Sequence, residues 1–253
     1  MCGRYLRRSD KQRIAEAFEV SKGLADLVLP PWDYNVAPTT FQPVIRPAVD
    51  SGHDTGEREL ALMRWGLVPY FATDLKRFSY STINARAESL TTSSIFRTPF
   101  ERRRCLVPAD GFYEWKVLPT PTLFGPDPTL KSANKKGVAE KQPYAFTLAS
   151  GEPFAFAGLW DRWRDPAGGT LESFSIITTT PNELTATVHD RMPVILRPQD
   201  YDRWLRRSSQ EQTAPLELLA LLRPYPADQM AAHEAHPDVG NVRNNHPGLL
   251  NSA

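Results

Sequence analysis

The sequence predicts an α+β fold, with one domain over residues 1–253, a mixed and partly closed β-sheet, and short peripheral helices. The length suits one large domain or two small ones, and no shift in composition marks a boundary between two. The 23 prolines exceed the typical share of about 5%, which favours loops and short strands over long helices. Strand-like and helix-like segments do not alternate regularly, so a βαβ arrangement is not indicated.

In the first half of the chain, short apolar runs predict strands and capping residues predict helix starts. Ser9-Asp10-Lys11-Gln12 has the form of a capping box, which predicts a helix from there to about Val20. A polar loop is expected over 50–58. Strands are predicted over 3–6, 42–49, 60–67, 105–109 and 112–116, and short helical segments over 83–90, after Asn84, and over 98–104.

The second half begins with a segment, 117–142, that is rich in Pro, Thr, Lys and Gly and is expected to be a loop insertion. The next two strands, 144–149 and 154–160, are predicted to form a hairpin around Ser150-Gly151-Glu152. Residues 246–253 are expected to be a flexible tail. Further strands are predicted over 174–179, 192–196 and within 239–250, and helices over 182–188, 199–206 and 216–222.

Composition indicates the cellular compartment and limits how a partner could be bound. The two cysteines, Cys2 and Cys105, cannot make a disulfide framework, and neither a signal peptide nor an apolar run of about 20 residues is present. A cytoplasmic protein with no membrane partner is expected. Lys plus Arg number 30 and Asp plus Glu 29, so a nucleic acid would have to be held by local basic patches. No metal or other cofactor is predicted, because His233 and His236 form the only close histidine pair and no CxxC motif accompanies them.

The N-terminal sequence Met1-Cys2-Gly3-Arg4-Tyr5 is the stretch most suggestive of chemistry. If Met1 is removed, Cys2 presents an α-amine and a thiol on adjacent carbons, and this 1,2-aminothiol can condense with an aldehyde to an imine and then a thiazolidine. An electropositive setting would lower the pKa of both groups from their free values of about 8 and about 8.5. The alternative is a frayed terminus that happens to contain cysteine.

Three further polar residues lie in apolar surroundings. Asn84 follows a strand-like run and is either a buried amide with hydrogen-bond partners or a helix N-cap. Glu114 stands between Tyr113 and Trp115, where burial would raise the pKa of its carboxyl, although strand alternation could instead point it to solvent. His189 has the ordinary pKa of a proton shuttle, although a lone histidine is more often structural.

Seven blocks together resemble one family, the SOS-response-associated peptidase (SRAP) family, whose members are also called abasic-site processing proteins. The blocks occur in order from residue 2 to about 245, so the resemblance covers nearly the whole chain. They are Met1-Cys2-Gly3-Arg4-Tyr5, Tyr34-Asn35-Val36-Ala37-Pro38, Arg64-Trp65-Gly66-Leu67-Val68-Pro69, Ile83-Asn84-Ala85-Arg86-Ala87-Glu88, Gly111-Phe112-Tyr113-Glu114-Trp115, His189-Asp190-Arg191-Met192-Pro193 and Val239-Gly240-Asn241-Val242.

The resemblance implies a monomer that binds single-stranded DNA at an abasic site and is linked to it through a thiazolidine on Cys2, with attendant lyase or autoproteolytic activity. It implies a role in the DNA damage and SOS response, and nucleoid association when bound to DNA. By the same resemblance Cys2 is the nucleophile, Asn84 orients the aminothiol, and Glu114 and His189 form an acid–base pair. Arg4, Arg86 and Arg191 are expected near phosphates, and Tyr70 and Phe71 are hypothesised to stack on a base.

One alternative from another class stays open. Glutamine amidotransferases also begin Met-Cys-Gly, so the chain could be an N-terminal-nucleophile amidohydrolase or peptidase in which the α-amine of Cys2 is the base for its own thiol. The basic residues that follow Cys2 suit an anionic substrate better. A non-catalytic nucleic-acid module is a third possibility, and it would not need Cys2 at the terminus.

Overall fold

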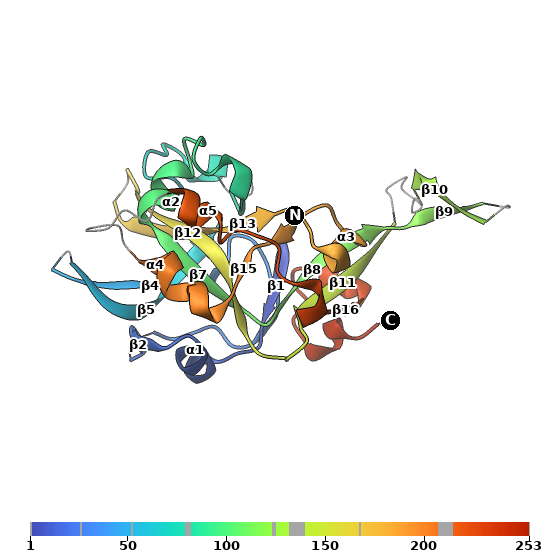
Figure 1. Cartoon of the computed structure of the whole chain (residues 1–253), viewed down its shortest axis with the longest axis horizontal. Helices are drawn as coiled ribbons and strands as arrows, with labels where there is room; N and C mark the ends of the chain where they lie inside the picture. Colours follow the sequence, from blue (N-terminus) through green and yellow to red (C-terminus); the bar gives the residue numbers. More distant parts are fainter. Residues whose placement is uncertain are drawn as a thin grey trace.

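Two β-sheets packed against each other form the body of the molecule (Figure 1). The structure is a computed structural model that describes residues 2–25, 27–51, 53–78, 82–122, 125–131, 140–166, 168–206 and 215–252. No helix in this described part is long and apolar enough to cross a membrane. Sheets with short helices make up the described part, in agreement with the predicted α+β class.

The larger sheet contains a closed ring of five strands. Its strand order is β14-β13-β12-β7-β4-β5-β2, and β13 also pairs with β5 in parallel, with Ser173 opposite Arg64. This additional pairing closes β13, β12, β7, β4 and β5 into a barrel. The bounds are β2 Val20–Lys22, β4 Phe41–Asp50, β5 His53–Trp65, β7 Arg104–Ala109, β12 Phe154–Arg164, β13 Thr170–Thr179 and β14 Met192–Pro193, with β6 Asn84–Arg86 on β13 and β15 Ile195–Leu196 on β12.

The smaller sheet has the order β16-β11-β8-β1-β3 and is antiparallel. Its strand β1 lies between β8 and β3, so the N-terminal segment is held inside the sheet and not at its edge. The strand predicted over 3–6 is therefore confirmed as β1, and the alternative of a frayed terminus is excluded for residues 4–7. The bounds are β1 Arg4–Arg7, β3 Asp33–Val36, β8 Gly111–Val117, β11 Lys141–Leu148 and β16 Met230–Glu234.

Successive side chains of the barrel strands point to opposite faces, and each face packs into its own apolar core. Val44, Val107 and Phe156 face one core, which continues into the smaller sheet through Tyr5 and Phe112. The neighbouring residues on the same strands, such as Ile45, Leu106 and Ala157, face the other core. This second core is covered by four helices, through residues that include Ile14, Phe100, Trp204 and Leu218. These helices are α1 Lys11–Ala17, α2 Arg97–Arg102, α4 Tyr201–Leu205 and α5 Pro215–Leu219, whereas α3 Glu183–Ala186 packs against the first core through Leu184.

Four local predictions are corrected by the structure. The first helix is capped by Asp10, whose Oδ1 accepts from the Arg13 amide at 2.8 Å, because Ser9 instead donates its hydroxyl to Asp110. The expected polar loop over 50–58 belongs to the long β4–β5 pair. The segment after Asn84 is strand β6 and then a 3-10 turn, Ala87–Ser89, not an α-helix. The last strand is β16, upstream of 239–250, which holds 3-10 turns at Pro237–Gly240 and Pro247–Leu250.

The hairpin predicted for the strands 144–149 and 154–160 is also wrong. Its two strands, β11 and β12, are consecutive, but β11 pairs with β8 and β16, whereas β12 pairs with β7 and β13. The turn between them is therefore a crossing from one sheet to the other. Because the strands cross, Phe146 of β11 and Phe154 and Phe156 of β12 enter the same apolar core from two different sheets.

Within the expected insertion 117–142, strands β9 Pro119–Thr122 and β10 Gly125–Lys131 pair with each other, and residues 123–124 and 132–139 lie outside the described residues. Figure 1 shows this ribbon projecting away from the two sheets, at the right of the view. At the C-terminal end, Leu249 of the expected tail is fully buried beside Leu6 and Tyr113.

Candidate active site

Strand β1 brings Cys2 to the junction of the two sheets. Its side chain is fully buried, and its thiol donates to the Arg4 carbonyl with an Sγ–O distance of 3.6 Å. The carbonyl of Cys2 accepts a hydrogen bond of 2.8 Å from Nδ2 of Asn84. Cys2 thus lies in the apolar core shared by the barrel and the smaller sheet, and its backbone is held by a residue 82 positions later.

Burial dominates the electrostatic setting of the Cys2 thiol. Burial raises the pKa of the thiol, and the nearby Glu114 carboxylate raises it further. The electropositive setting that would lower this pKa is therefore not what surrounds the thiol. A base must take the thiol proton before the sulfur can act as a nucleophile.

Glu114 points into the protein, toward the same core as Cys2. Along β8 the residues Phe112 and Glu114 alternate with Tyr113 and Trp115, and Phe112 and Tyr113 pack into different clusters. Glu114 is only 2% exposed, and burial raises the pKa of its carboxyl to about 7. The solvent-facing alternative is thus excluded, and the carboxyl is poised to give or accept a proton near neutral pH.

His189 closes the cluster from the segment that follows α3. Asn182 caps that helix by accepting from the Thr185 amide, and the His189 amide continues the turn to the Thr185 carbonyl at 2.9 Å. The imidazole Nε2 lies 3.9 Å from Oε2 of Glu114. The side chain is 27% exposed, so the cluster is open to solvent on the His189 side.

The groups around His189 determine which protonation state its ring adopts. Nδ1 accepts from the Arg191 amide at 3.1 Å, which leaves the proton of a neutral ring on Nε2, toward Glu114. Nδ1 is also 2.9 Å from Asp190 Oδ1, an arrangement that favours the charged ring. Burial is the larger effect and lowers the pKa of His189 below its usual value, against the influence of Asp190. The ring is therefore mainly neutral at pH 7.

Asn84 is the first residue of β6 and not a helix N-cap. Strand β6 runs parallel to β13, with Asn84 opposite Ile176. The side chain is 8% exposed and, within the described residues, its Oδ1 has no hydrogen-bond partner. A buried amide oxygen without a partner is costly, and it offers an acceptor to a group that arrives with the substrate.

The three predicted phosphate-contacting arginines differ in their environments. Arg4 donates to the Gly3 carbonyl at 2.8 Å. Arg86 lies on β6, is exposed, and has no side-chain hydrogen bond or ion pair in the described part of the chain. Arg191 donates to both carboxylate oxygens of Glu88, at 2.6 and 3.0 Å, and to the Thr178 carbonyl at 2.7 Å. Arg86 is thus the more available cation, and Arg191 already holds an anion.

Tyr70 and Phe71 are exposed and contact each other edge to face, with ring centroids 5.3 Å apart. The Tyr70 amide donates to Asp161 of β12 at 3.0 Å. This bond ties Tyr70 to β12, whereas the structure brings four other predicted residues, Cys2, Asn84, Glu114 and His189, together.

Glu88 is the residue of this region that sequence reasoning missed. It stands in the quoted block with Asn84 and Arg86, but its partner Arg191 is 103 positions away, and no local spacing indicates that contact. The lowered pKa of its carboxyl, caused first by the hydrogen bond from Arg191, keeps it ionised. No group of three or more His, Cys, Asp or Glu in the described residues could hold a metal ion.

Comparison with known proteins gives consistent matches over the full length. A family model described as SOS response associated peptidase (SRAP) matches residues 1–242. A Bacillus subtilis protein named abasic site processing protein YoqW is 39% identical over 252 residues, and the match covers all of both chains. The Rattus norvegicus protein named abasic site processing protein HMCES is 29% identical over 271 residues, which is 99% of this chain and 75% of that protein. A crystal structure of a Bacteroides thetaiotaomicron protein matches with a TM-score of 0.79 at 26% identity, with both chains fully covered.

Proposed function

The chain belongs to the SOS response associated peptidase (SRAP) family, and on this premise we propose that it binds abasic sites in single-stranded DNA and is linked to them through Cys2. One observation carries the proposal: Cys2, Asn84, Glu114 and His189 converge from four separate segments of the chain. The printed names of the relatives, abasic site processing proteins, indicate the substrate class.

The proposed chemistry begins with an aldehyde and ends with a ring. An abasic sugar is mostly a closed hemiacetal, which opens to an aldehyde at C1′ when a proton moves between its oxygens. The α-amine of Cys2, freed by removal of Met1, adds to C1′ and gives a carbinolamine, which loses water to form an imine. The thiol then adds to C1′ while its proton passes to the imine nitrogen. The products are one thiazolidine and one water.

The side chains of the cluster suit these steps. Glu114, with a carboxyl pKa of about 7, can protonate the departing hydroxyl as an acid and accept the thiol proton as a carboxylate. His189, mainly neutral and partly exposed, can move the proton that opens the sugar. Asn84 holds the Cys2 carbonyl and thereby fixes the direction of the adjacent amine.

The same imine accounts for lyase chemistry. When an imine forms at C1′, the C2′ hydrogens become acidic, and loss of one expels the 3′ phosphate by β-elimination. Ring closure by the thiol removes the imine and competes with this strand cleavage. We therefore expect a stable adduct as the main product and nicking as the minor one.

The electrostatics favour this proposal over a Cys2 amidohydrolase or peptidase. A thiolate nucleophile needs a lowered pKa or an adjacent base, and burial together with Glu114 raises the pKa of the Cys2 thiol. Attack by the amine requires no thiolate. Exposed Arg86 and the two exposed aromatics supply groups suited to a strand of DNA.

The test uses wild type and Cys2→Ala with an oligonucleotide that contains one abasic site, followed by intact-mass analysis. Wild type should gain the oligonucleotide mass less one water and should lack Met1. Cys2→Ala keeps an N-terminal amine but has no thiol, so it should give no stable adduct alone, a borohydride-trapped adduct, and nicking at least as fast as wild type. A stable adduct from Cys2→Ala without reductant would place the bond elsewhere, and no adduct from wild type would end the proposal.

A further inference from the structure

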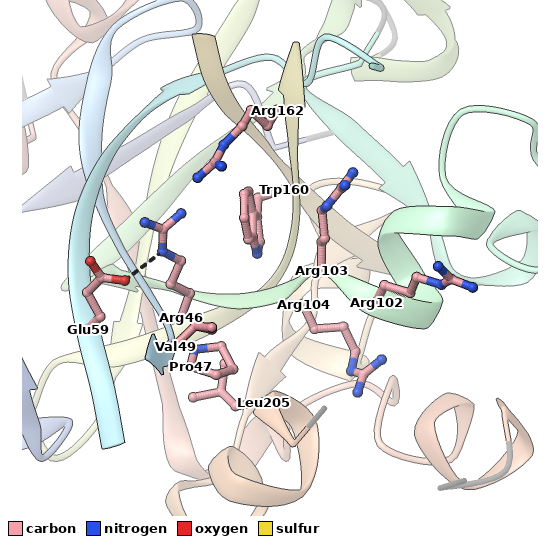
Figure 2. A pocket seen from close by; sticks show the side chains of 10 residues that line it. All are labelled: Arg46, Pro47, Val49, Glu59, Arg102, Arg103, Arg104, Trp160, Arg162 and Leu205. Atoms are coloured by element: carbon pink, nitrogen blue, oxygen red, sulfur yellow. Dashed lines mark hydrogen bonds and ion pairs between the residues drawn. The ribbon is translucent and has the colours of Figure 1, made fainter. Parts of the chain in front are cut away.

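A concave feature lies outside the Cys2 cluster. It is a pocket of about 350 Å³ lined by five arginines, Arg46, Arg102, Arg103, Arg104 and Arg162, together with Trp160 (Figure 2). We call it the arginine pocket. Figure 2 shows guanidinium groups on both sides of the Trp160 ring and above it.

The arginine pocket and the Cys2 cluster lie toward opposite ends of the barrel. On β13, Glu172 accepts from Arg46 and Arg162 of the pocket, whereas Thr178 accepts from Arg191 beside the cluster. Six residues of extended strand separate these two positions, which is about 20 Å at about 3.3 Å per residue. A ligand in the pocket would therefore not touch the reacting atoms at Cys2.

The pocket holds more positive than negative charge. Arg46 pairs with Glu59 and Glu172, both at 2.9 Å, Arg162 shares Glu172, and Arg103 pairs with the buried Asp161. Five guanidinium groups thus face three carboxylates, a difference of two positive charges. Two unbalanced charges in a concave site attract an anion more strongly than the same charges on a flat, solvated surface.

Arg104 is the most buried of the five arginines that give the pocket its excess positive charge. It is 4% exposed, and its donors are all directed to backbone carbonyls: those of Trp204, Phe100, Glu101 and Arg206. It has no ion pair with a carboxylate in the described residues, and burial lowers the pKa of its guanidinium to about 10. The charge of Arg104 is therefore fixed in place but not neutralised, and a nearby anion would stabilise it.

Trp160 holds two of the cations in position. The guanidinium carbon of Arg46 lies 4.8 Å from the Trp160 ring centroid, and that of Arg103 lies 5.8 Å from it. Both contacts are within the range of cation–π attraction. Because these groups are ordered before any ligand arrives, little side-chain entropy is lost on binding.

Arg102 is the free donor of the pocket. It ends α2, is exposed, and makes no hydrogen bond or ion pair within the described part of the chain. Its planar guanidinium can therefore bind a phosphate through two parallel hydrogen bonds without breaking an existing contact.

We propose that the arginine pocket binds a phosphate group that carries two negative charges, as in a small phosphorylated ligand. Three features match this chemistry: the excess of two positive charges, the ordered guanidinium groups and the unoccupied guanidinium of Arg102. A pocket of this size suits a small molecule such as a pyrophosphate or nucleoside diphosphate. The terminal phosphate of a DNA strand has the same chemistry and is the second source to be tested.

The experiment measures binding of pyrophosphate to the full chain by titration calorimetry. Arg102→Glu places a carboxylate where the proposal needs a cation, and because Arg102 is exposed and without partners, the fold should be kept. Pyrophosphate affinity should fall about tenfold or more. The control is Arg97→Glu, which changes an exposed arginine of the same helix that does not line the pocket. It should stay within about twofold of wild type, since its charge lies outside the pocket.

A second pair of probes separates the two sources of phosphate. Oligonucleotides with a 5′-phosphate and with a 5′-hydroxyl are compared on wild type and Arg102→Glu. A phosphate-dependent gain that Arg102→Glu removes would assign the pocket to DNA ends, and binding of pyrophosphate alone would assign it to a free ligand. No binding of any phosphate probe at about 10 mM, or equal losses in Arg97→Glu and Arg102→Glu, would overturn the proposal.

This inference is independent of the Cys2 chemistry. Cys2→Ala leaves every residue of the arginine pocket in place, so pyrophosphate affinity should be the same as in wild type. Loss of pyrophosphate binding in Cys2→Ala would contradict the separation of the two sites along the barrel.

Discussion

His189 Nε2 lies 3.9 Å from Glu114 Oε2, and burial shifts the pKa values of the two groups in opposite directions. The carboxyl pKa rises to about 7, and the imidazole pKa falls below its usual value, so the usual order of the two groups is reversed. Near neutral pH the carboxyl can therefore give or accept a proton beside a mainly neutral imidazole. This reversal is the physical basis for the acid–base roles proposed above.

The first prediction concerns catalysis by Glu114. Glu114→Gln keeps the shape of the side chain but cannot transfer a proton, so adduct formation should slow by roughly 10²–10⁴-fold. The rate is measured as the accumulation of adduct mass at pH 7. Glu101→Gln, a change at an exposed glutamate of α2, should leave the rate unchanged. Equal rates in wild type and Glu114→Gln would mean that Glu114 has only a structural role.

The second prediction concerns stability. The folded protein holds the Glu114 proton up to about pH 7, whereas the unfolded chain releases it near 4.5. Folding therefore binds a proton between these pH values, and the free energy of unfolding should fall as pH rises through this window. In Glu114→Gln the free energy of unfolding should fall by about 3 kcal/mol less than in wild type over this pH range, since one pKa unit is about 1.4 kcal/mol. Denaturant unfolding at pH 4.5 and pH 8 checks this, and parallel pH profiles for both proteins would contradict it.

The third prediction concerns the hydrogen bond from Asn84 to the Cys2 carbonyl. Asn84→Asp replaces the donor by an oxygen, so the Cys2 backbone loses its support and adduct formation should slow at least about tenfold. Asn35→Asp is a matched control, because Asn35 is also a buried amide that donates to backbone carbonyls, those of Asn241 and Asn244. Its adduct rate per folded molecule should match wild type. Equal slowing in both variants would mean that Asn84 acts through stability alone.

The fourth prediction concerns Arg86. An exposed arginine without a partner can neutralise one phosphate, so Arg86→Ala should weaken binding to abasic and intact single strands alike. The slope of log affinity against log salt should become shallower by about 0.7. Fluorescence anisotropy at several salt concentrations measures both effects. An unchanged slope would place Arg86 outside the path of the strand.

The fifth prediction concerns the Glu88–Arg191 pair. A phosphate that approaches Arg191 must compete with the Glu88 carboxylate, which already accepts from both terminal nitrogens of the guanidinium. Glu88→Gln should therefore raise the affinity for single-stranded DNA about threefold to tenfold, in the range of a charged hydrogen bond. The same anisotropy titration measures it. Weaker binding in Glu88→Gln would indicate that Glu88 positions Arg191 for DNA and does not compete with it.

The fold class and most strands could be predicted because strand segments carry their own signal of alternating or continuous apolar residues. Which strands pair could not be predicted. The hairpin expected around Ser150-Gly151-Glu152 failed because the aromatic residues of β11 and β12 give no indication of which sheet each strand joins. The Ser9 cap failed for a similar reason, since Asp110 takes the Ser9 hydroxyl from 101 positions away.

The candidate site was predicted better than the sheet pairing, because Cys2, Asn84, Glu114 and His189 each stand in a recognisable block. The raised pKa of the Cys2 thiol could not be predicted, since a basic sequence around Cys2 says nothing about burial. Glu88 was missed because its function in the structure depends on Arg191, which is distant in sequence. Contacts between remote segments are set by the whole fold, and no local pattern contains them.

The position of β1 has a mechanical consequence. A DNA strand bonded to Cys2 would pull on the fold through β1, which is hydrogen-bonded on both sides, to β3 and to β8. Both pairings are antiparallel, so a load along β1 acts at right angles to their hydrogen bonds and must shear two ladders at once. At the far end of β1, Asp110 accepts from the amides of Arg8 and Ser9 and resists sliding. A motor enzyme that meets the lesion would thus be resisted by a whole sheet and not by a loose chain end.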